Sequence, residues 1–232
     1  MLKTKINVNL GVSRDYKDYD LEMNKVQRAV DLGAEAIMDL SSHGNTQPFR
    51  QKLCSECTAM IGTVPVYDSV IHYQRDLDTL TARDFIDVVK MHAEDGVDFV
   101  TLHCGITRKT IEQIRNGGRK MNIVSRGGSL VFAWMSMTGE ENPFYEYYDE
   151  ILEICREHDV TISLGDACRP SCLGTAIRTA ATLPRSISSR PSSKISIAAE
   201  SVSRSCALRD SFRSATAASS KSGTFPFRIF PR

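Results

Sequence analysis

Short apolar segments alternate with longer amphipathic segments along the first 168 residues. In the segment that begins at Thr81, the side chains of Phe85, Val88, Val89 and His92 recur with the spacing of one helix face. Glycine at position 33 follows a segment of the same kind, and glycine is common immediately after a helix. The pattern predicts six strands, at residues 5–9, 36–40, 62–66, 98–102, 122–125 and 160–164, and helices near residues 21–32, 47–58 and 142–158 as well as the one opened by Thr81.

Strands that alternate with helices are typical of a parallel sheet, because a parallel connection needs a long, right-handed crossover. A Rossmann-type sheet and an α/β barrel both have this order. No G-x-G-x-x-G follows the first predicted strand and no G-x-x-x-x-G-K-[ST] occurs in the chain, so the barrel is favoured. We therefore expect residues 1–170 to form an incomplete (β/α)8 barrel of about six βα units and residues 171–232 to form a separate tail.

Polar or glycine-rich sequence follows each predicted strand, whereas the inner strand positions are apolar. The carboxyl ends of the strands carry the active site in α/β barrels. The pattern therefore predicts a small-molecule site on one rim. The strand ends are Asn9, Met38-Asp39, Pro65-Val66-Tyr67, His103-Cys104-Gly105, Ser125-Arg126-Gly127-Gly128, and Gly165-Asp166 with Arg169 just beyond.

The segment Ser125-Arg126-Gly127-Gly128 is the most informative of these strand ends. Successive backbone N–H groups beside glycines can form an anion-binding concavity, and arginine adds a fork of donors for phosphate. A plain glycine turn is the alternative. The other strand ends also have ordinary explanations: Asn9 as a turn residue, Tyr67 as a packed side chain, His103 as a neutral histidine satisfied by backbone groups, and Asp166 with Arg169 as a simple ion pair.

Charge divides the chain at residue 169. The net charge of +1 combines −8 over residues 1–168 with +9 over residues 169–232. No apolar run is long enough to span a membrane and the first residues do not resemble a signal peptide, so we expect a cytoplasmic protein with no membrane partner. Seven cysteines are expected to be reduced thiols, and Cys54-x-x-Cys57 has no second pair at zinc-finger spacing, so no metal site is predicted.

Six blocks, taken together and in order, closely resemble phosphomethylpyrimidine synthase of thiamine biosynthesis. The resemblance covers residue 4 to about residue 170. The Ser-Arg-Gly-Gly-Ser and Gly-Thr-Val-Pro-x-Tyr blocks are its most specific parts. The blocks are Ile6-Asn7-Val8-Asn9-Leu10-Gly11, the stretch from Gly33 to Ser41, Gly62-Thr63-Val64-Pro65-Val66-Tyr67, the stretch from Gly96 to His103, Val124-Ser125-Arg126-Gly127-Gly128-Ser129, and Ser163-Leu164-Gly165-Asp166 with Arg169-Pro170.

The resemblance implies a radical S-adenosylmethionine (SAM) lyase that converts 5-aminoimidazole ribotide into hydroxymethylpyrimidine phosphate. It implies a 4Fe-4S cluster, SAM and zinc as cofactors, and a possible homodimer. Residues 1–170 would then be the substrate-binding half, with the anionic groups of the ribotide held at the Ser-Arg-Gly turn and at Arg169. No catalytic residue is assigned; the family's ribotide contacts match Asn9, Met38, Tyr67, His103, Ser125, Arg126, Gly127, Asp166, Ala167, Cys168 and Arg169.

The family pattern breaks near Arg169. Its Gly-Asp-Gly-Leu-Arg-Pro-Gly reads Gly-Asp-Ala-Cys-Arg-Pro-Ser here, and neither Glu-Gly-Pro-Gly-His nor C-x-x-C-x-x-x-x-C follows. The ligands of the cluster and of zinc are therefore expected to be absent from this chain. We expect it to be inactive alone and unstable, with exposed sheet edges. The alternative is a catalytically inert ribotide-binding fragment. An unrelated barrel aldolase or isomerase would need a Schiff-base lysine or an acid/base pair at the rim, and this chain offers no good candidate, because Lys3 and Lys5 precede the end of the first strand.

Serine and arginine dominate the last 64 residues, which include 15 serines and only two acidic residues. No helical or strand period is evident, so the sequence predicts disorder. Binding to nucleic acid through arginine is the alternative, but it is not expected, because regular Arg-Ser dipeptides and an RNA-binding fold are missing. A shifted reading frame beyond the Arg169 codon is the hypothesis preferred for this tail.

Overall fold

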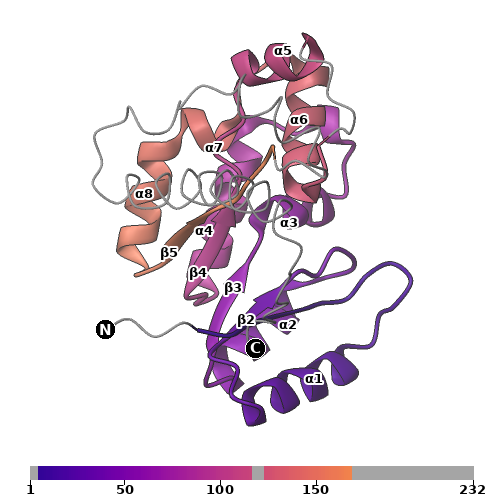
Figure 1. Ribbon diagram of the computed structural model, residues 1–232, viewed down its shortest axis with the longest axis vertical. Coiled ribbons are helices and arrows are strands. Elements are labelled where there is room, and N and C mark those ends of the chain that lie inside the picture. Colours follow the sequence, from indigo (N-terminus) through magenta and orange to yellow (C-terminus); the bar gives the residue numbers. More distant parts are fainter. Residues whose placement is uncertain (1–4, 117–122, 169–232) are drawn as a thin grey trace, which may run out of the picture. The chain divides into compact units, whose positions relative to one another are not determined.

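The computed structural model describes residues 5–116 and 123–168 (Figure 1). The chain divides into two compact units, residues 1–184 and 185–232, and the second lies entirely outside the described residues. The predictions for the tail at residues 171–232, its disorder and its origin, therefore also lie outside them.

Five parallel strands form one sheet in the described part of the chain. Their order in the sheet is β1-β2-β3-β4-β5, so each strand pairs with the next one in the sequence (Figure 1). In a doubly wound sheet the order of the strands reverses at a switch point, and the order of these five strands does not reverse. The α/β class with a parallel sheet is thereby confirmed. The strands are β1 (Asn7–Leu10), β2 (Ala36–Asp39), β3 (Met60–Thr63), β4 (Phe99–Leu102) and β5 (Thr161–Leu164).

The sheet is not closed within the described residues, because β1 and β5 each pair with a strand on one side only. The three central strands are the most buried, and they include the buried side chains of Ile37 in β2, Ile61 in β3 and Val100 in β4. Residues of β1 and β5 are exposed or half-buried. Closure into a barrel therefore stays a prediction.

The prediction of a strand at residues 122–125 is wrong for residues 123–125, which the structure describes. Residues 123–125 are irregular, and β4 pairs directly with β5 through Val100 and Ile162. The side chain of Ser125 instead caps a helix by accepting a hydrogen bond from the backbone N–H of Gly128. This capping outweighs the strand propensity of Ile123 and Val124.

Nine helical segments connect or follow the strands within residues 5–116 and 123–168. The helix predicted to open at Thr81 is confirmed as α4, where Thr81 and Asp84 form a capping box. Pro65 was expected at the end of a strand but begins α3, because proline is well suited to the first position of a helix. The segments are α1 (Tyr19–Asp31), α2 (Gln47–Glu56), α3 (Pro65–Tyr73), the 3-10 helix η1 (Leu77–Thr79), α4 (Ala82–Glu94), α5 (Arg108–Asn116), α6 (Arg126–Thr138), α7 (Pro143–Glu146) and α8 (Tyr148–Glu157).

Aromatic packing joins α4, α6 and α7. The ring of Phe85 lies 5.3 Å from that of Trp134 and 5.9 Å from that of Phe144, measured between centroids, and both contacts are edge-on. All three side chains are fully buried, and the indole N–H of Trp134 donates to the carbonyl of Leu80. This cluster fixes α6, whose first turn carries the Ser-Arg-Gly segment, against the rest of the unit. Within the described residues, no helix combines the length and apolar character needed to cross a membrane.

Candidate functional site

Sheet register places the predicted site residues of the strands at one edge. Asn9 of β1 pairs with Met38 of β2, and Met38 pairs with Gly62 of β3. Leu102 pairs with Leu164, so His103 and Gly165 directly follow neighbouring strands. Because carboxyl ends of parallel strands share an edge of the sheet, the residues after β4 and β5 lie on the same edge as Asn9 and Met38.

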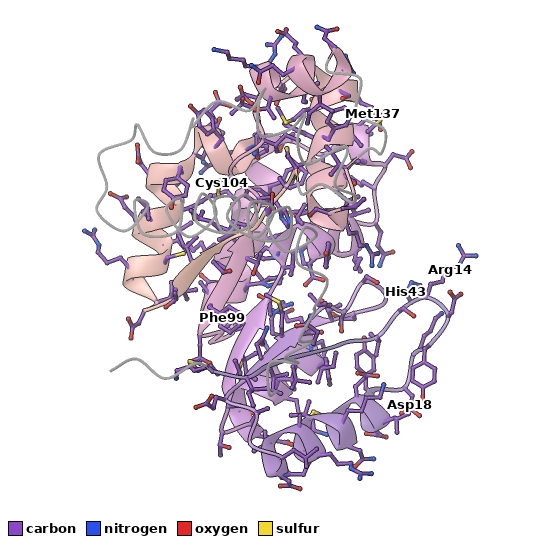
Figure 2. All side chains as sticks on the ribbon, viewed as in Figure 1. Arg14, Asp18, His43, Phe99, Cys104 and Met137 are labelled. Carbon is purple, nitrogen blue, oxygen red and sulfur yellow. The ribbon has the colours of Figure 1, made fainter. Side chains whose placement is uncertain are left out.

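The ring of His103 is held between two segments of backbone. It is buried, and its Nε2 lies 3.1 Å from the hydroxyl oxygen of Ser125. A Cβ atom added to Gly127 would lie 2.2 Å from the ring, and one added to Gly165 would lie 3.0 Å from it. The two glycines therefore allow an imidazole to approach the first turn of α6 and the end of β5 closely. Cys104, which follows this histidine, is also buried (Figure 2).

Gly128 serves a similar purpose for the chain after β5. A Cβ atom at this position would lie 2.2 Å from the carbonyl oxygen of Ala167. This oxygen is a backbone atom, so it cannot move away by rotation of a side chain. Ala167 and Cys168 are buried, whereas Asp166 is exposed. We expected the paired glycines to let an anion approach. In the structure the space beside Gly127 and Gly128 is taken by His103 and Ala167.

Arg126 and Tyr67 meet although they are 59 positions apart. Arg126 is exposed at the first position of α6, and its guanidinium carbon lies 4.9 Å from the centroid of the Tyr67 ring. This distance is that of a cation–π contact, and the guanidinium of this exposed arginine carries five N–H donors that can also form hydrogen bonds. Tyr67 reaches this position from the first turn of α3, not from a strand end as predicted.

The remaining predicted residues are less closely joined. Asn9 is exposed and its side-chain oxygen accepts a hydrogen bond from the amide of Asn7, and Met38 is half-buried. Arg169 lies outside the described residues, so its pairing with Asp166 stays a prediction. The structure thus brings His103, Ser125 and Gly127 into direct contact and places Arg126 on Tyr67.

A buried polar network that the sequence analysis missed lies directly beside Tyr67. One carboxylate oxygen of Asp68 accepts from Arg50 at 2.6 Å, from Thr46 at 2.6 Å and from His92 at 2.9 Å. The other nitrogen of His92 lies 2.8 Å from the hydroxyl of Thr63, at the end of β3. The guanidinium of Arg50 also binds Asp95, at 2.7 and 2.9 Å.

Charge and burial act in opposite directions in this network. Burial alone would raise the pKa of Asp68, but the hydrogen bond from His92 and the charge of Arg50 outweigh it and lower the pKa to about 2. Burial lowers the pKa of His92, so its imidazole is neutral. The stabilisation from Asp68 is therefore complete above about pH 4 and is lost as the pH falls towards 2.

The pKa of Asp39, at the end of β2, is raised, whereas that of Asp68 is lowered. Asp39 is buried and accepts hydrogen bonds from the backbone N–H and the hydroxyl of Ser41. Burial raises the pKa of Asp39 to about 6, although the two bonds from Ser41 oppose the shift. The hydroxyl oxygen of Ser41 in turn accepts from the N–H of Val12, which ties the loop after β2 to the loop after β1.

Replacing Asp39 with asparagine is expected to change how stability depends on pH. A carboxyl whose pKa is raised on folding stabilises the folded state below the unfolded pKa, and this stabilisation is lost as the pH rises through the folded pKa of about 6. The free energy of unfolding of the natural chain, relative to the Asp39→Asn variant, should therefore fall by about 2 kcal/mol between pH 4 and pH 7. Urea denaturation at a series of pH values measures this difference, and parallel curves for the two proteins would contradict it.

Metal-ligating side chains do not gather in the part of the chain that the structure describes. No group of three or more His, Cys, Asp or Glu side chains there could hold a metal ion. Burial raises the pKa of the Cys54 thiol to about 11, whereas a metal ligand must be a thiolate. The described residues therefore do not fit an iron-sulfur cluster or a zinc ion.

The family follows from comparison with known proteins. A model of the radical SAM ThiC family matches residues 1–183. The chain belongs to the radical SAM ThiC family. Proteins named phosphomethylpyrimidine synthase are similar to this ThiC-family chain: those of Alkaliphilus oremlandii, Clostridium acetobutylicum and Clostridium novyi are 60%, 59% and 58% identical over 172 residues. In each case the match covers 74% of this chain and 39% of the relative, so the chain spans about two fifths of the length of these relatives.

Proposed function

We propose that residues 1–170 form the ribotide-binding half of a phosphomethylpyrimidine synthase, part of a (β/α)8 barrel. The consecutive order of the parallel strands supports a barrel, since each strand is followed in the sheet by the next in sequence. The substrate would be 5-aminoimidazole ribotide, which carries a phosphate, a ribose and an imidazole. The reaction would be its radical rearrangement to hydroxymethylpyrimidine phosphate in thiamine biosynthesis, which the names of the relatives support.

One observation carries the proposal: His103, Ser125 and the first turn of α6 are in contact at the edge where the predicted strand-end residues lie. Arg126 stands exposed at this helix N-terminus, where partial positive charge and a guanidinium both favour an anion. The phosphate of the ribotide would bind there. The imidazole and ribose would form hydrogen bonds with the side chains of Asn9, Tyr67 and His103. Met38 would pack against a ring.

Positioning is the contribution that these residues would make to the reaction. A radical intermediate reacts with whatever group lies nearest, so the substrate must be held in one orientation. The buried pair of His103 and Ser125 is suited to this purpose, because burial and the neighbouring glycines leave the imidazole little freedom. When bound, SAM and a 4Fe-4S cluster supply the radical in this family. Ligands for the cluster and for zinc would come from outside the residues described.

Substitution of two residues tests the proposed site. Replacing Arg126 with alanine removes charge-assisted hydrogen bonds to the phosphate, and replacing His103 with alanine removes a buried hydrogen-bonding group. Each variant should bind aminoimidazole ribotide at least about tenfold more weakly than the natural chain, measured by isothermal titration calorimetry. Arg83→Ala, an exposed residue paired with Glu150, is the control and should bind like the natural chain. Equal affinity in all four proteins would refute the assignment.

The alternative is a ribotide-binding fragment without catalytic activity. The two readings differ in whether the polypeptide supplies ligands for the cluster, and no C-x-x-C-x-x-x-x-C segment occurs in the sequence. Both readings predict ribotide binding, and they differ in turnover. For either, we propose a cytoplasmic protein that binds a small molecule, with no nucleic-acid or membrane partner and with the family's homodimer as a possible assembly.

A further inference from the structure

Asn142 connects the loop after β4 to the start of α7. Its side chain is fully buried, and its amide nitrogen donates to the backbone carbonyls of His103 and Ile106, at 2.8 Å in each case. Its amide oxygen accepts from the backbone N–H of Phe144 at 3.0 Å, which caps α7. Two hydrogen bonds from one fully buried amide thus fix a loop that begins with a predicted site residue, and the third holds the amide at the start of α7.

Glu141 holds the other end of the same loop. Its carboxylate accepts from the backbone N–H of Arg108, at 3.1 and 3.3 Å, and from the N–H of Asn142, at 2.8 Å. Residues 103–108 are therefore attached at both ends to two adjacent side chains. We call Glu141 and Asn142 the β4 clasp.

The main chain of His103 must be placed accurately for its ring to fit. Gly127 and Gly165 border the ring so closely that a single added carbon at either position would crowd it. The hydroxyl of Ser125 meets the ring at Nε2, so the ring end of the residue is fixed from α6 and its carbonyl end is fixed by Asn142. A shift of the carbonyl would move the imidazole out of this narrow space.

We infer that Asn142 is a positioning residue of the ribotide site, acting through the main chain of His103. The inference rests on the proposed function for its link to the ribotide. Its structural part, control of the His103 ring by a side chain 39 positions away, stands independently.

Two variants separate this role from simple helix capping. Serine is as good as asparagine at a helix N-cap, so Asn142→Ser retains an acceptor for Phe144 but has no amide donors for the carbonyls of His103 and Ile106. Glu141→Ala is the second variant, because it loosens the far end of the loop and leaves the buried amide in place. Asp18→Ala removes the N-cap of α1, far along the chain from the clasp, and is the matched control (Figure 2).

The experiment records the imidazole nitrogen signals of His103 by NMR in the full chain labelled with ¹⁵N-histidine, together with the affinity for aminoimidazole ribotide. In Asn142→Ser, the His103 signals should shift or broaden and the dissociation constant should rise about tenfold or more. In Glu141→Ala the same signals should move less, and in Asp18→Ala they should match those of the natural chain. If Asn142→Ser instead has the His103 signals and the ribotide affinity of the natural chain, Asn142 only caps α7 and the inference is overturned.

The two readouts also separate the inference from the proposed function. If the natural chain does not bind the ribotide, the proposed function fails, and the His103 signals alone decide whether Asn142 positions the ring. If Asn142→Ser does not fold, the His103 signals of Glu141→Ala decide, and signals identical to those of the natural chain would overturn the inference.

Discussion

Replacing Arg50 with alanine should lower the free energy of unfolding by about 3–5 kcal/mol, because it leaves two buried carboxylates without their counter-charge. Arg50 is 1% exposed and binds both Asp68 and Asp95. Their remaining hydrogen bonds come from neutral groups such as Thr46 and the amides of glutamines. Urea denaturation at pH 7 measures the loss.

Arg83 provides the comparison for Arg50. It also pairs with a carboxylate, that of Glu150, but both side chains are largely exposed and solvent screens their charges. Arg83→Ala should therefore leave the free energy of unfolding almost unchanged. If Arg50→Ala were as mild as Arg83→Ala, the buried network would not be a source of stability in the folded chain.

Replacing Gly127 with alanine should weaken ribotide binding about 100-fold, because the added methyl carbon occupies the place of the His103 ring. The Cβ atom would lie 2.2 Å from that ring, so either the imidazole or the first turn of α6 must move. Stability should also fall by about 1–3 kcal/mol, the usual result of overpacking a buried site. Calorimetric titration and urea denaturation give the two values.

Met137→Ala is the control for this change, because Met137 lies on the same helix and is 53% exposed (Figure 2). It should bind the ribotide like the natural chain. Normal affinity in Gly127→Ala would mean that the place of the His103 ring does not matter for binding, and the site as described here would be wrong.

Local signals in the sequence predicted much of the fold. The apolar face that includes Phe85 and Val88, in the segment that begins at Thr81, predicted α4 at its observed start, which Thr81 and Asp84 cap in the structure. Alternation of strands and helices predicted the parallel sheet, and all five observed strands begin within two residues of their predicted starts. The strand predicted at residues 122–125 is the exception, since the described residues 123–125 are irregular. Here the hydrogen bond between Ser125 and Gly128 favours the start of a helix over a strand.

Contacts between distant residues could not be predicted in the same way. Arg50 is 18 positions from Asp68 and 45 from Asp95, and nothing in the local pattern joins them. Gly127 and Gly128 were recognised as sites of close approach, but the sequence does not show that His103 and Ala167 are what approaches. Asn142 precedes a proline, which indicates a helix start, yet its bonds to the loop after β4 depend on the folded arrangement.

Binding of the ribotide at one edge of the sheet is the central claim, and NMR mapping of backbone amide shifts tests it most directly. Aminoimidazole ribotide added to ¹⁵N-labelled full chain should perturb the amides of Asn9, Met38, His103, Gly127 and Asp166 together, while those of α1 and α8 remain unchanged. Perturbations scattered over α1 and α8, or none at saturating ribotide, would contradict the claim.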